Sequence, residues 1–305
     1  MTPAPSRHLA QSVHQRLLNK ARERREDPNL ILIHYALERF LYRLACSAHR
    51  DRFILKGAML FAAWTDQPHR PTRDLDLLGI GDSSDQALIR VFGEIVGTSV
   101  EPDGLEFDGR SISISEIREA QDYPGKRIKL PTRLGNARLN LQIDVGFGDA
   151  VTPEPSEIDY PALLDMPAPR IRAYPCETVI AEKLQALVAF DMAISRMKDF
   201  YDMWTLSKQF PFEGAPLSAA IAATFERRGT AIPGGVPTAL TDEFANDRTK
   251  QTQWAAFLKG SGLTDAPPSL SGVVHDLRTF LLEPLLATSE RQAFPKSWKP
   301  GGPWA

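Results

Sequence analysis

The sequence predicts an α+β fold in which strands and flanking helices come first and a helical C-terminal part follows. Three observations predict it. Apolar residues recur with helical spacing over residues 9–48. Short runs of strand length, several of them alternating apolar with polar residues, then occupy residues 52–149. Helical spacing returns from residue 176 onward. Because strands and helices are segregated along the chain, we expect a first domain at residues 1–165 and a helical domain at residues 166–305.

The individual elements follow from local patterns. The N-terminal region predicts two helices broken near "EDPN", because proline cannot continue the first helix. The expected strands are residues 52–57, 72–81, 110–117, 126–130 and 137–149, with helices at 58–64 and 85–96. Six prolines between Pro153 and Pro175 predict a crossing between domains. The later helices are expected at 176–190, 196–209, 217–229, 250–259 and 270–287. The tail is either loose or docked through Trp298 and Trp304.

Composition excludes several classes of protein. The 305 residues carry 36 Lys and Arg against 38 Asp and Glu, so the total charge indicates no particular partner. The two cysteines, Cys46 and Cys176, have no metal-ligand spacing and indicate no disulfide framework, which fits a reducing cytosol. No apolar run approaches the ~20 residues that span a bilayer. We therefore expect a cytoplasmic protein with no membrane partner.

The distribution of charge is more informative than the total. Ten cations against five acids occupy residues 7–52: Arg7, Arg16, Lys20, Arg22, Arg24, Arg25, Arg39, Arg43, Arg50 and Arg52. A second basic cluster comprises Lys126, Arg127, Lys129, Arg133 and Arg138. Both clusters fit contacts with phosphates, and both equally fit ordinary surface charge.

Two aspartates stand one residue apart in the strand "TRDLDLLGIG". Residues two apart in a strand point to the same face, so Asp74 and Asp76 project together while Leu75 and Leu77 face the core. Adjacent carboxylates repel unless a cation lies between them, and Mg²⁺ commonly takes one or two carboxylates. An exposed edge strand with two solvated acids explains the pair equally well.

A later strand supplies a third acid. In "RLNLQIDV" the apolar residues share one face, and Asp144 lies on the polar face. If this strand neighbours the first, Asp144 joins Asp74 and Asp76, and three acids hold one or two metals. An ordinary half-buried strand is the alternative.

Glycine and polar residues precede the aspartate pair. Gly57, followed by Ala58, ends a strand where a backbone without a side chain lets amides approach a phosphate. Lys56 either contacts phosphates or lies along the surface, and the Thr72 hydroxyl is placed to bond a phosphate oxygen.

The helical half offers three further candidates. Lys183 lies off the apolar stripe of its helix. A side chain in that position would reach a triphosphate. Asp199 and Asp202 are three residues apart and therefore share a helix face. The alternatives are a solvated lysine and a surface ion pair.

Together these motifs resemble a known family. The run "RFILKGAMLFAAW…TRDLDLLGIGD", the later "ETVIAEKLQAL" and "RMKDFYDMW" are similar to the AbiEii-type nucleotidyltransferase toxins of bacterial type IV abortive-infection and toxin–antitoxin systems. The likeness runs from about Ser12 to about Leu286.

The resemblance implies a polymerase-β-like nucleotidyltransferase domain with a mixed sheet, then a helical part. Gly57 matches the glycine of the phosphate turn, and Asp74 and Asp76 match the metal-binding D-x-D. Lys183 matches the lysine of the "AEK" helix, and Asp199 and Asp202 match the acids of the "KDxYD" motif. Ala58 departs from the pattern, because Ser or Gly usually follows that glycine.

The resemblance also implies an activity and partners. It implies transfer of a nucleoside monophosphate from an NTP, with Mg²⁺ or Mn²⁺, to an acceptor such as the 3′ end of tRNA, and a cognate antitoxin encoded alongside. Two alternatives remain open: a non-catalytic nucleotide- or RNA-binding module with the same fold, and a glycosyltransferase, whose D-x-D also binds metal.

Overall fold

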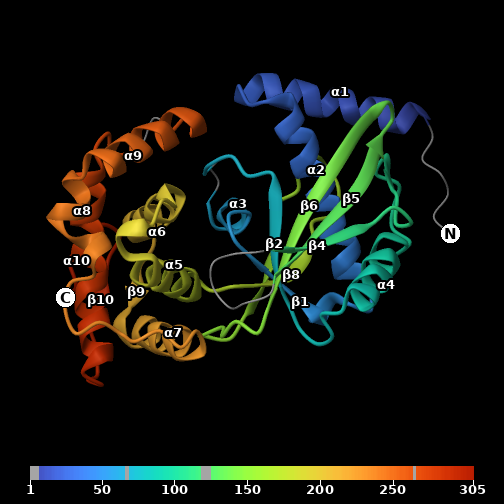
Figure 1. Ribbon diagram of the computed structural model, residues 1–305. Coiled ribbons are helices and arrows are strands. Elements are labelled where there is room, and N and C mark those ends of the chain that lie inside the picture. The colour runs from blue at the N-terminus through green and yellow to red at the C-terminus, as the bar shows by residue number, and fades with distance from the viewer. Residues whose placement is uncertain (1–6, 66–68, 118–124, 264–265) are drawn as a thin grey trace. The chain divides into compact units, whose positions relative to one another are not determined.

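The computed structural model of the protein describes residues 7–65, 69–117, 125–263 and 266–305 (Figure 1). The chain divides into two compact units. The first comprises Met1–Gly148 and Ser156–Ala173, and the second comprises Asp149–Pro155 and Tyr174–Ala305.

The first unit is built on a mixed sheet, as the α+β prediction requires. Its strands in the described residues are β1 (Phe53–Lys56), β2 (Asp74–Gly79), β3 (Leu105–Phe107), β4 (Ser113–Ile117), β5 (Gly125–Leu134), β6 (Ala137–Phe147), β7 (Ser156–Asp159) and β8 (Arg170–Ala173). Their order is β3-β5-β6-β2-β1-β8-β7, with β4 also paired to β5. Strand β2 is central: it is antiparallel to β1 and parallel to β6.

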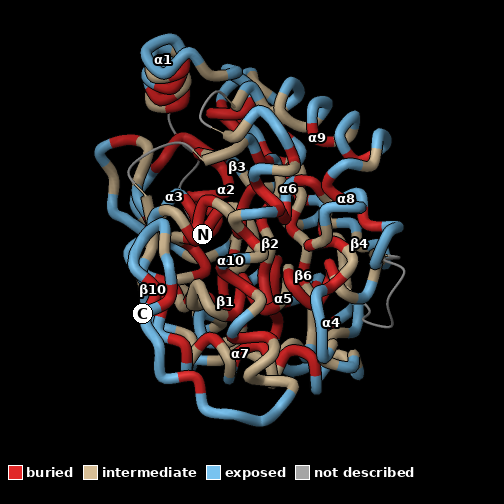
Figure 2. The backbone as a smooth tube through the Cα atoms, turned by 90° about the vertical axis from the view of Figure 1, so that its left-hand side faces the viewer, coloured by how far each residue is buried: buried red, intermediate tan, exposed pale blue. Residues whose placement is uncertain are grey.

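Helices cover one face of this sheet because that face is apolar. Along β6 the residues Leu139, Leu141, Ile143 and Val145 are buried, and they alternate with polar residues. Helix α2 (Pro28–Cys46) contacts both β6 and α4 (Asp85–Val96), and α4 also contacts β4. Figure 2 shows the buried residues that line β1, β2 and β6. The opposite face of β6 therefore carries the polar side chains.

The N-terminal helices form as expected. Helix α1 (Arg7–Arg24) packs against α2, and α2 begins where Asp27 accepts a hydrogen bond from the Asn29 amide. Proline at the first turn of α2 is tolerated because no intrahelical partner is needed there.

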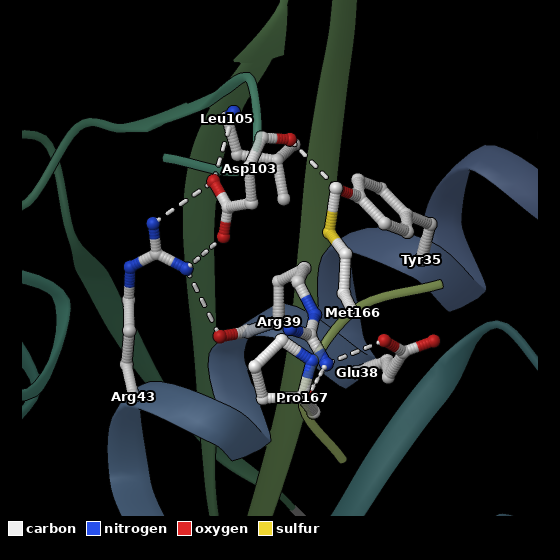
Figure 3. A network of polar contacts seen from close by, with 8 residues as sticks. All are labelled: Tyr35, Glu38, Arg39, Arg43, Asp103, Leu105, Met166 and Pro167. Carbon is white, nitrogen blue, oxygen red and sulfur yellow. Dashed lines mark hydrogen bonds and ion pairs between the residues drawn. The ribbon is translucent and has the colours of Figure 1, made fainter. Parts of the chain in front are cut away.

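A buried polar network removes two cations, Arg39 and Arg43, from the expected N-terminal basic patch (Figure 3). Arg43 makes a two-pronged contact with Asp103, at 2.6 and 3.1 Å, and Arg39 pairs with Glu38 at 2.7 Å. Arg39 also donates to the carbonyl oxygen of Pro167, and Tyr35 donates to that of Asp103. Arg39 and Arg43 are only 1% and 4% exposed. They stabilise the fold from inside and are closed to a phosphate backbone.

The sequence did not reveal three strands of the first unit. Strand β3 has only three residues, and β7 and β8 lie in the proline-rich stretch that was expected to cross between domains. Instead β7 and β8 pair with each other, and β8 joins β1 through the Leu55–Ala173 pair. The chain thus enters the second unit briefly at Asp149–Pro155 before it returns. Strand β5 extends to Leu134, beyond the expected Leu130. Its Pro131 lies between the residues that pair with β4 and with β3, where a missing N–H costs least.

The second unit is helical, as predicted. Its helices in the described residues are α5 (Cys176–Phe190), α6 (Met197–Gln209), α7 (Gly214–Arg227), α8 (Asp242–Asn246), α9 (Arg248–Ser261) and α10 (Leu270–Ser289). A two-stranded ribbon of β9 (Phe212–Glu213) and β10 (Ser297–Trp298) ties down the tail. The Trp298 indole donates to the Ser207 carbonyl at 2.7 Å, and the Trp304 indole to that of Phe280 at 2.8 Å. The tail is therefore docked. No described helix has the length and apolarity needed to cross a bilayer.

Candidate active site

Three carboxylates converge on the polar face of the first sheet. Asp74 and Asp76 occupy alternate positions of β2, while Leu75 and Leu77 are buried on the other side. The parallel register places Asp144 of β6 directly beside Asp76. One oxygen from each of the three lies within 4.8 Å of the others. Alternation along the strands and their pairing bring together what the sequence separates.

Asp144 is held in place by Arg127 of β5. The guanidinium donates from Nε to Oδ1 at 2.9 Å and from Nη2 to Oδ2 at 2.7 Å. This hydrogen-bonded pairing with Asp144, together with the charges of Asp74 and Asp76, raises the pKa of Arg127 above its ordinary value. A bidentate arginine fixes both the position and the plane of the carboxylate. Asp144 is thus oriented before any ligand arrives.

The turn at Gly57 lies directly against Asp76. Gly57 has a positive φ of 74°, a conformation that favours glycine. A Cβ at this position would stand 2.0 Å from Oδ2 of Asp76 and 2.7 Å from its Cγ. The glycine therefore makes room for the carboxylate. This steric role is additional to the phosphate contact expected from the sequence.

Lys56 and Thr72 also lie near the carboxylates. Lys56 pairs across the strands with Asp76, so it shares the face of that carboxylate. The Thr72 hydroxyl donates to Oδ1 of Asp74 at 2.5 Å. Ala58 follows Gly57 in the turn, and its carbonyl accepts from the Phe61 amide at 3.3 Å.

Cations continue along the same face, away from the carboxylates. The exposed residues Lys129, Arg133 and Arg138 occupy positions on β5 and β6 in phase with Arg127 and Asp144. We call these three cations, together with Arg127, the basic strip. The fifth member of the expected cluster, Lys126, points to the opposite face, where it pairs with Asp85 of α4 at 2.8 Å. The strip thus excludes Lys126.

The second unit contains its own cluster of candidate residues. Lys183 of α5 contacts Asp199 at 2.6 Å and Asp202 at 2.9 Å, both on α6. Arg196 contacts the other oxygen of Asp199 at 2.7 Å. Both acids are 0% exposed, so this is a buried ion-pair network and no surface pair. The structure places Lys183, Asp199 and Asp202 together in this unit and the carboxylates in the first.

The sequence did not predict the roles of two residues near the carboxylates, Arg127 and His34. Arg127 was expected only as part of a basic cluster. The two-residue turn at Gly135 and Asn136 contained the missing information, because counting outward from it places Arg127 opposite Asp144. His34, whose Nε2 lies 2.6 Å from the Thr72 carbonyl oxygen, is 38 positions from its partner, and no local pattern predicts it.

The carboxylates fit a hard divalent cation. Three carboxylate oxygens that lie this close repel one another, and Mg²⁺ and Mn²⁺ favour oxygen ligands. Asp74, Asp76 and Asp144 would hold the ion. When bound, it would supply charge neutralisation at the phosphates and polarisation of an attacking hydroxyl.

Comparison with known proteins finds a matching family and similar solved structures. A family model described as "Nucleotidyl transferase AbiEii toxin, Type IV TA system" matches residues 39–281. The crystal structure of JHP933 from Helicobacter pylori is 16% identical, with a TM-score of 0.48, covering 85% of this chain and 90% of that one. The structure of a candidate nucleotidyltransferase from H. pylori is also 16% identical, with a TM-score of 0.47, covering 85% of this chain and 93% of that one. No curated protein matches the sequence.

Proposed function

Because this chain belongs to the AbiEii family of nucleotidyl transferase toxins of type IV toxin–antitoxin systems, we propose that it transfers a nucleoside monophosphate from an NTP to an RNA acceptor in a metal-dependent reaction. The convergence of Asp74, Asp76 and Asp144 is the observation that carries the proposal. We further propose the 3′ end of tRNA as the acceptor, the cytoplasm as the location and a cognate antitoxin as the partner.

The chemistry assigns roles to the residues of the first unit. The acceptor hydroxyl attacks the α-phosphorus of the NTP and a new P–O bond forms. The bond from that phosphorus to the bridging oxygen breaks, and pyrophosphate leaves. We assign acceptance of the hydroxyl proton to Asp144, whose orientation Arg127 fixes. Asp74, Asp76 and Asp144 would hold Mg²⁺ or Mn²⁺. The backbone at Gly57 and Ala58, with Lys56, would contact the phosphates. The Thr72 hydroxyl gives its single proton to Asp74, so we do not assign it the phosphate contact expected from the sequence.

The second unit supplies a further assignment. We assign to Lys183 a contact with the triphosphate, because Asp199 and Asp202 hold its ammonium group in a fixed position. The Lys183 side chain is 13% exposed. A lysine ordered in this way loses little conformational freedom on meeting an anion.

The basic strip supports an RNA acceptor. Arg127, Lys129, Arg133 and Arg138 lie on the face of the catalytic carboxylates, and a phosphate backbone following β5 and β6 would meet them in turn. A glycosyltransferase is disfavoured because the family is one of nucleotidyl transferases.

Labelled nucleotides test the reaction. Wild-type protein is incubated with Mg²⁺, total tRNA and each of the four NTPs labelled at the α-phosphate. We expect label in RNA, no label in RNA from γ-labelled NTP, and a loss of at least about 100-fold in Asp76→Asn. Asp159→Asn, an exposed aspartate on the edge strand β7, is the matched control. Equal labelling by wild type and Asp76→Asn defeats the assignment, and NTP binding without transfer to any acceptor establishes the non-catalytic module instead.

The basic strip has a separate test. In Lys129→Gln/Arg133→Gln we expect weaker RNA binding and a salt dependence whose slope falls by about two, with NTP affinity unchanged. Lys126→Gln, from the same strand but the opposite face, should leave both unchanged. If Lys126→Gln weakens RNA binding as much as Lys129→Gln/Arg133→Gln does, the basic strip is not the RNA surface. If the labelled nucleotide appears in protein and not in RNA, the acceptor is a protein.

A further inference from the structure

The segment that leads into β2 is held by a histidine from α2. Nε2 of His34 lies 2.6 Å from the carbonyl oxygen of Thr72. A carbonyl oxygen only accepts hydrogen bonds, so Nε2 carries the proton and the ring is the donor. The contact joins residues 38 positions apart, which fixes the end of this segment to the helix that covers the sheet.

Thr72 passes this constraint to the first carboxylate. The residue is 9% exposed, and its hydroxyl donates to Oδ1 of Asp74 at 2.5 Å. A β-branched side chain has few χ1 states, so the direction of the hydroxyl follows from the position of the Thr72 backbone. One residue therefore receives a hydrogen bond from His34 on its carbonyl and gives one to Asp74 from its side chain.

Asp74 needs such support more than Asp76 does. In the described residues the β1–β2 ladder ends at the Lys56–Asp76 pair, so Asp74 has a strand neighbour only on the β6 side, at Gln142. The first residue of a strand with a single neighbour is less constrained than one in the middle of a sheet. The contact from Thr72 constrains its side chain directly.

The surroundings of His34 favour its uncharged form, which suits this role. Burial lowers the pKa of His34 below its ordinary value, and the hydrogen bond to Thr72 and the charge of Glu26 oppose only part of that effect. A neutral imidazole supplies the donor without adding positive charge near carboxylates that are to attract a cation.

We propose that His34 is a positioning residue of the cation site: by holding the Thr72 carbonyl it aims the Thr72 hydroxyl at Asp74 and so fixes that carboxylate for a divalent ion. The inference rests on the proposed function, because it assumes that Asp74 is a ligand. It assigns to α2, a helix with no carboxylate of the site, a share of the cation affinity.

The experiment compares two amides at position 34. In His34→Gln the side-chain nitrogen reaches about as far as imidazole Nε2, whereas in His34→Asn it reaches only about as far as Nδ1. Both are polar, but only glutamine can donate to Thr72. Mn²⁺ binding to the full chain is measured by electron paramagnetic resonance without nucleotide, and urea unfolding without metal gives the stability of each variant.

We expect glutamine to keep wild-type affinity and asparagine to weaken it about fivefold to tenfold, near the lower end of the effect of groups that orient metal ligands. Thr72→Val should weaken it about tenfold, and His34→Asn/Thr72→Val should match Thr72→Val alone, because both residues act through one contact. His49→Asn, whose ring contacts Glu94 on α4, is the control and should bind as wild type does.

Several results would overturn the inference. Equal Mn²⁺ affinity in the two amide variants would do so, and so would additive losses of affinity in the double variant. Wild-type Mn²⁺ affinity in Thr72→Val would also do so. Because Thr72→Val leaves His34 in place, this last result decides the matter even where a position-34 variant does not fold. Failure of wild-type protein to bind Mn²⁺ at all refutes the proposed function instead, so the two failures are distinguishable.

Discussion

Substituting Gly57 by alanine tests the link between the turn and the three converging carboxylates. The new Cβ would stand 2.0 Å from Oδ2 of Asp76 and 2.7 Å from its Cβ and Cγ. No rotamer change of an alanine relieves this overlap, so Asp76 must turn away. The φ of 74° adds a strain of about 1–2 kcal/mol for a residue with a side chain.

Gly135→Ala separates strain from overlap. Gly135 belongs to the same unit, has a φ of 59°, and its added Cβ would meet only the Ala10 Cβ at an ordinary 3.7 Å. Both variants should lose about 1–2 kcal/mol from left-handed backbone strain. Only Gly57→Ala should also lose an oriented carboxylate, which we expect to weaken Mn²⁺ binding and transfer activity by about 100-fold.

The assay measures three quantities in both variants: Mn²⁺ affinity, nucleotide transfer at saturating metal, and the midpoint of thermal unfolding. The midpoint should fall by about 2–8 °C in each. If Gly57→Ala loses no more cation affinity than Gly135→Ala, then Asp76 does not depend on the turn, and the steric argument fails.

Three further predictions concern buried charges. Lys183→Met should lower the free energy of unfolding, measured by urea titration, by about 3 kcal/mol, because Asp199 and Asp202 stay buried without their shared cation. Adding Asp202→Asn should recover part of the lost stability. An unchanged free energy of unfolding in Lys183→Met would contradict the buried ion-pair network. Arg43→Met should cost about 3–5 kcal/mol in the same assay, since Asp103 is almost fully buried, whereas the exposed Arg110→Met should cost under about 0.5 kcal/mol. Because burial lowers the pKa of His34, the unfolded chain binds a proton at higher pH than the folded chain, so stability should fall as pH drops below about 6.5 and fall less in His34→Gln; identical pH profiles would rule this out.

Local alternation predicted much of the candidate site. Asp74 and Asp76 share a face because residues two apart always do, and the polar face of "RLNLQIDV" placed Asp144 on the correct side. That β6 lies beside β2 is a matter of tertiary pairing. From the sequence alone this pairing was only a condition, and the structure meets it.

The features that sequence analysis missed depend on non-local contacts. Arg39 and Arg43 look like surface cations on a helix, and much of the explanation for their burial lies in distant partners, the Pro167 carbonyl and Asp103. Strands β7 and β8 were hidden because prolines indicated a linker, whereas the edge of the sheet accepts short strands next to proline. The His34–Thr72 contact was missed for the same reason, because its two residues are 38 positions apart in the chain.

The parallel pairing of β2 and β6 has a consequence for biosynthesis. Asp76 is translated early, but its neighbour Asp144 follows only after α4 and the next three strands. Long-range parallel contacts form slowly and need both partners outside the ribosome. A nascent or prematurely terminated chain that stops before residue 144 therefore carries two of the three acids and no complete site. In this member of a toxin family, the complete set of three carboxylates therefore arises late, after most of the first unit has been made.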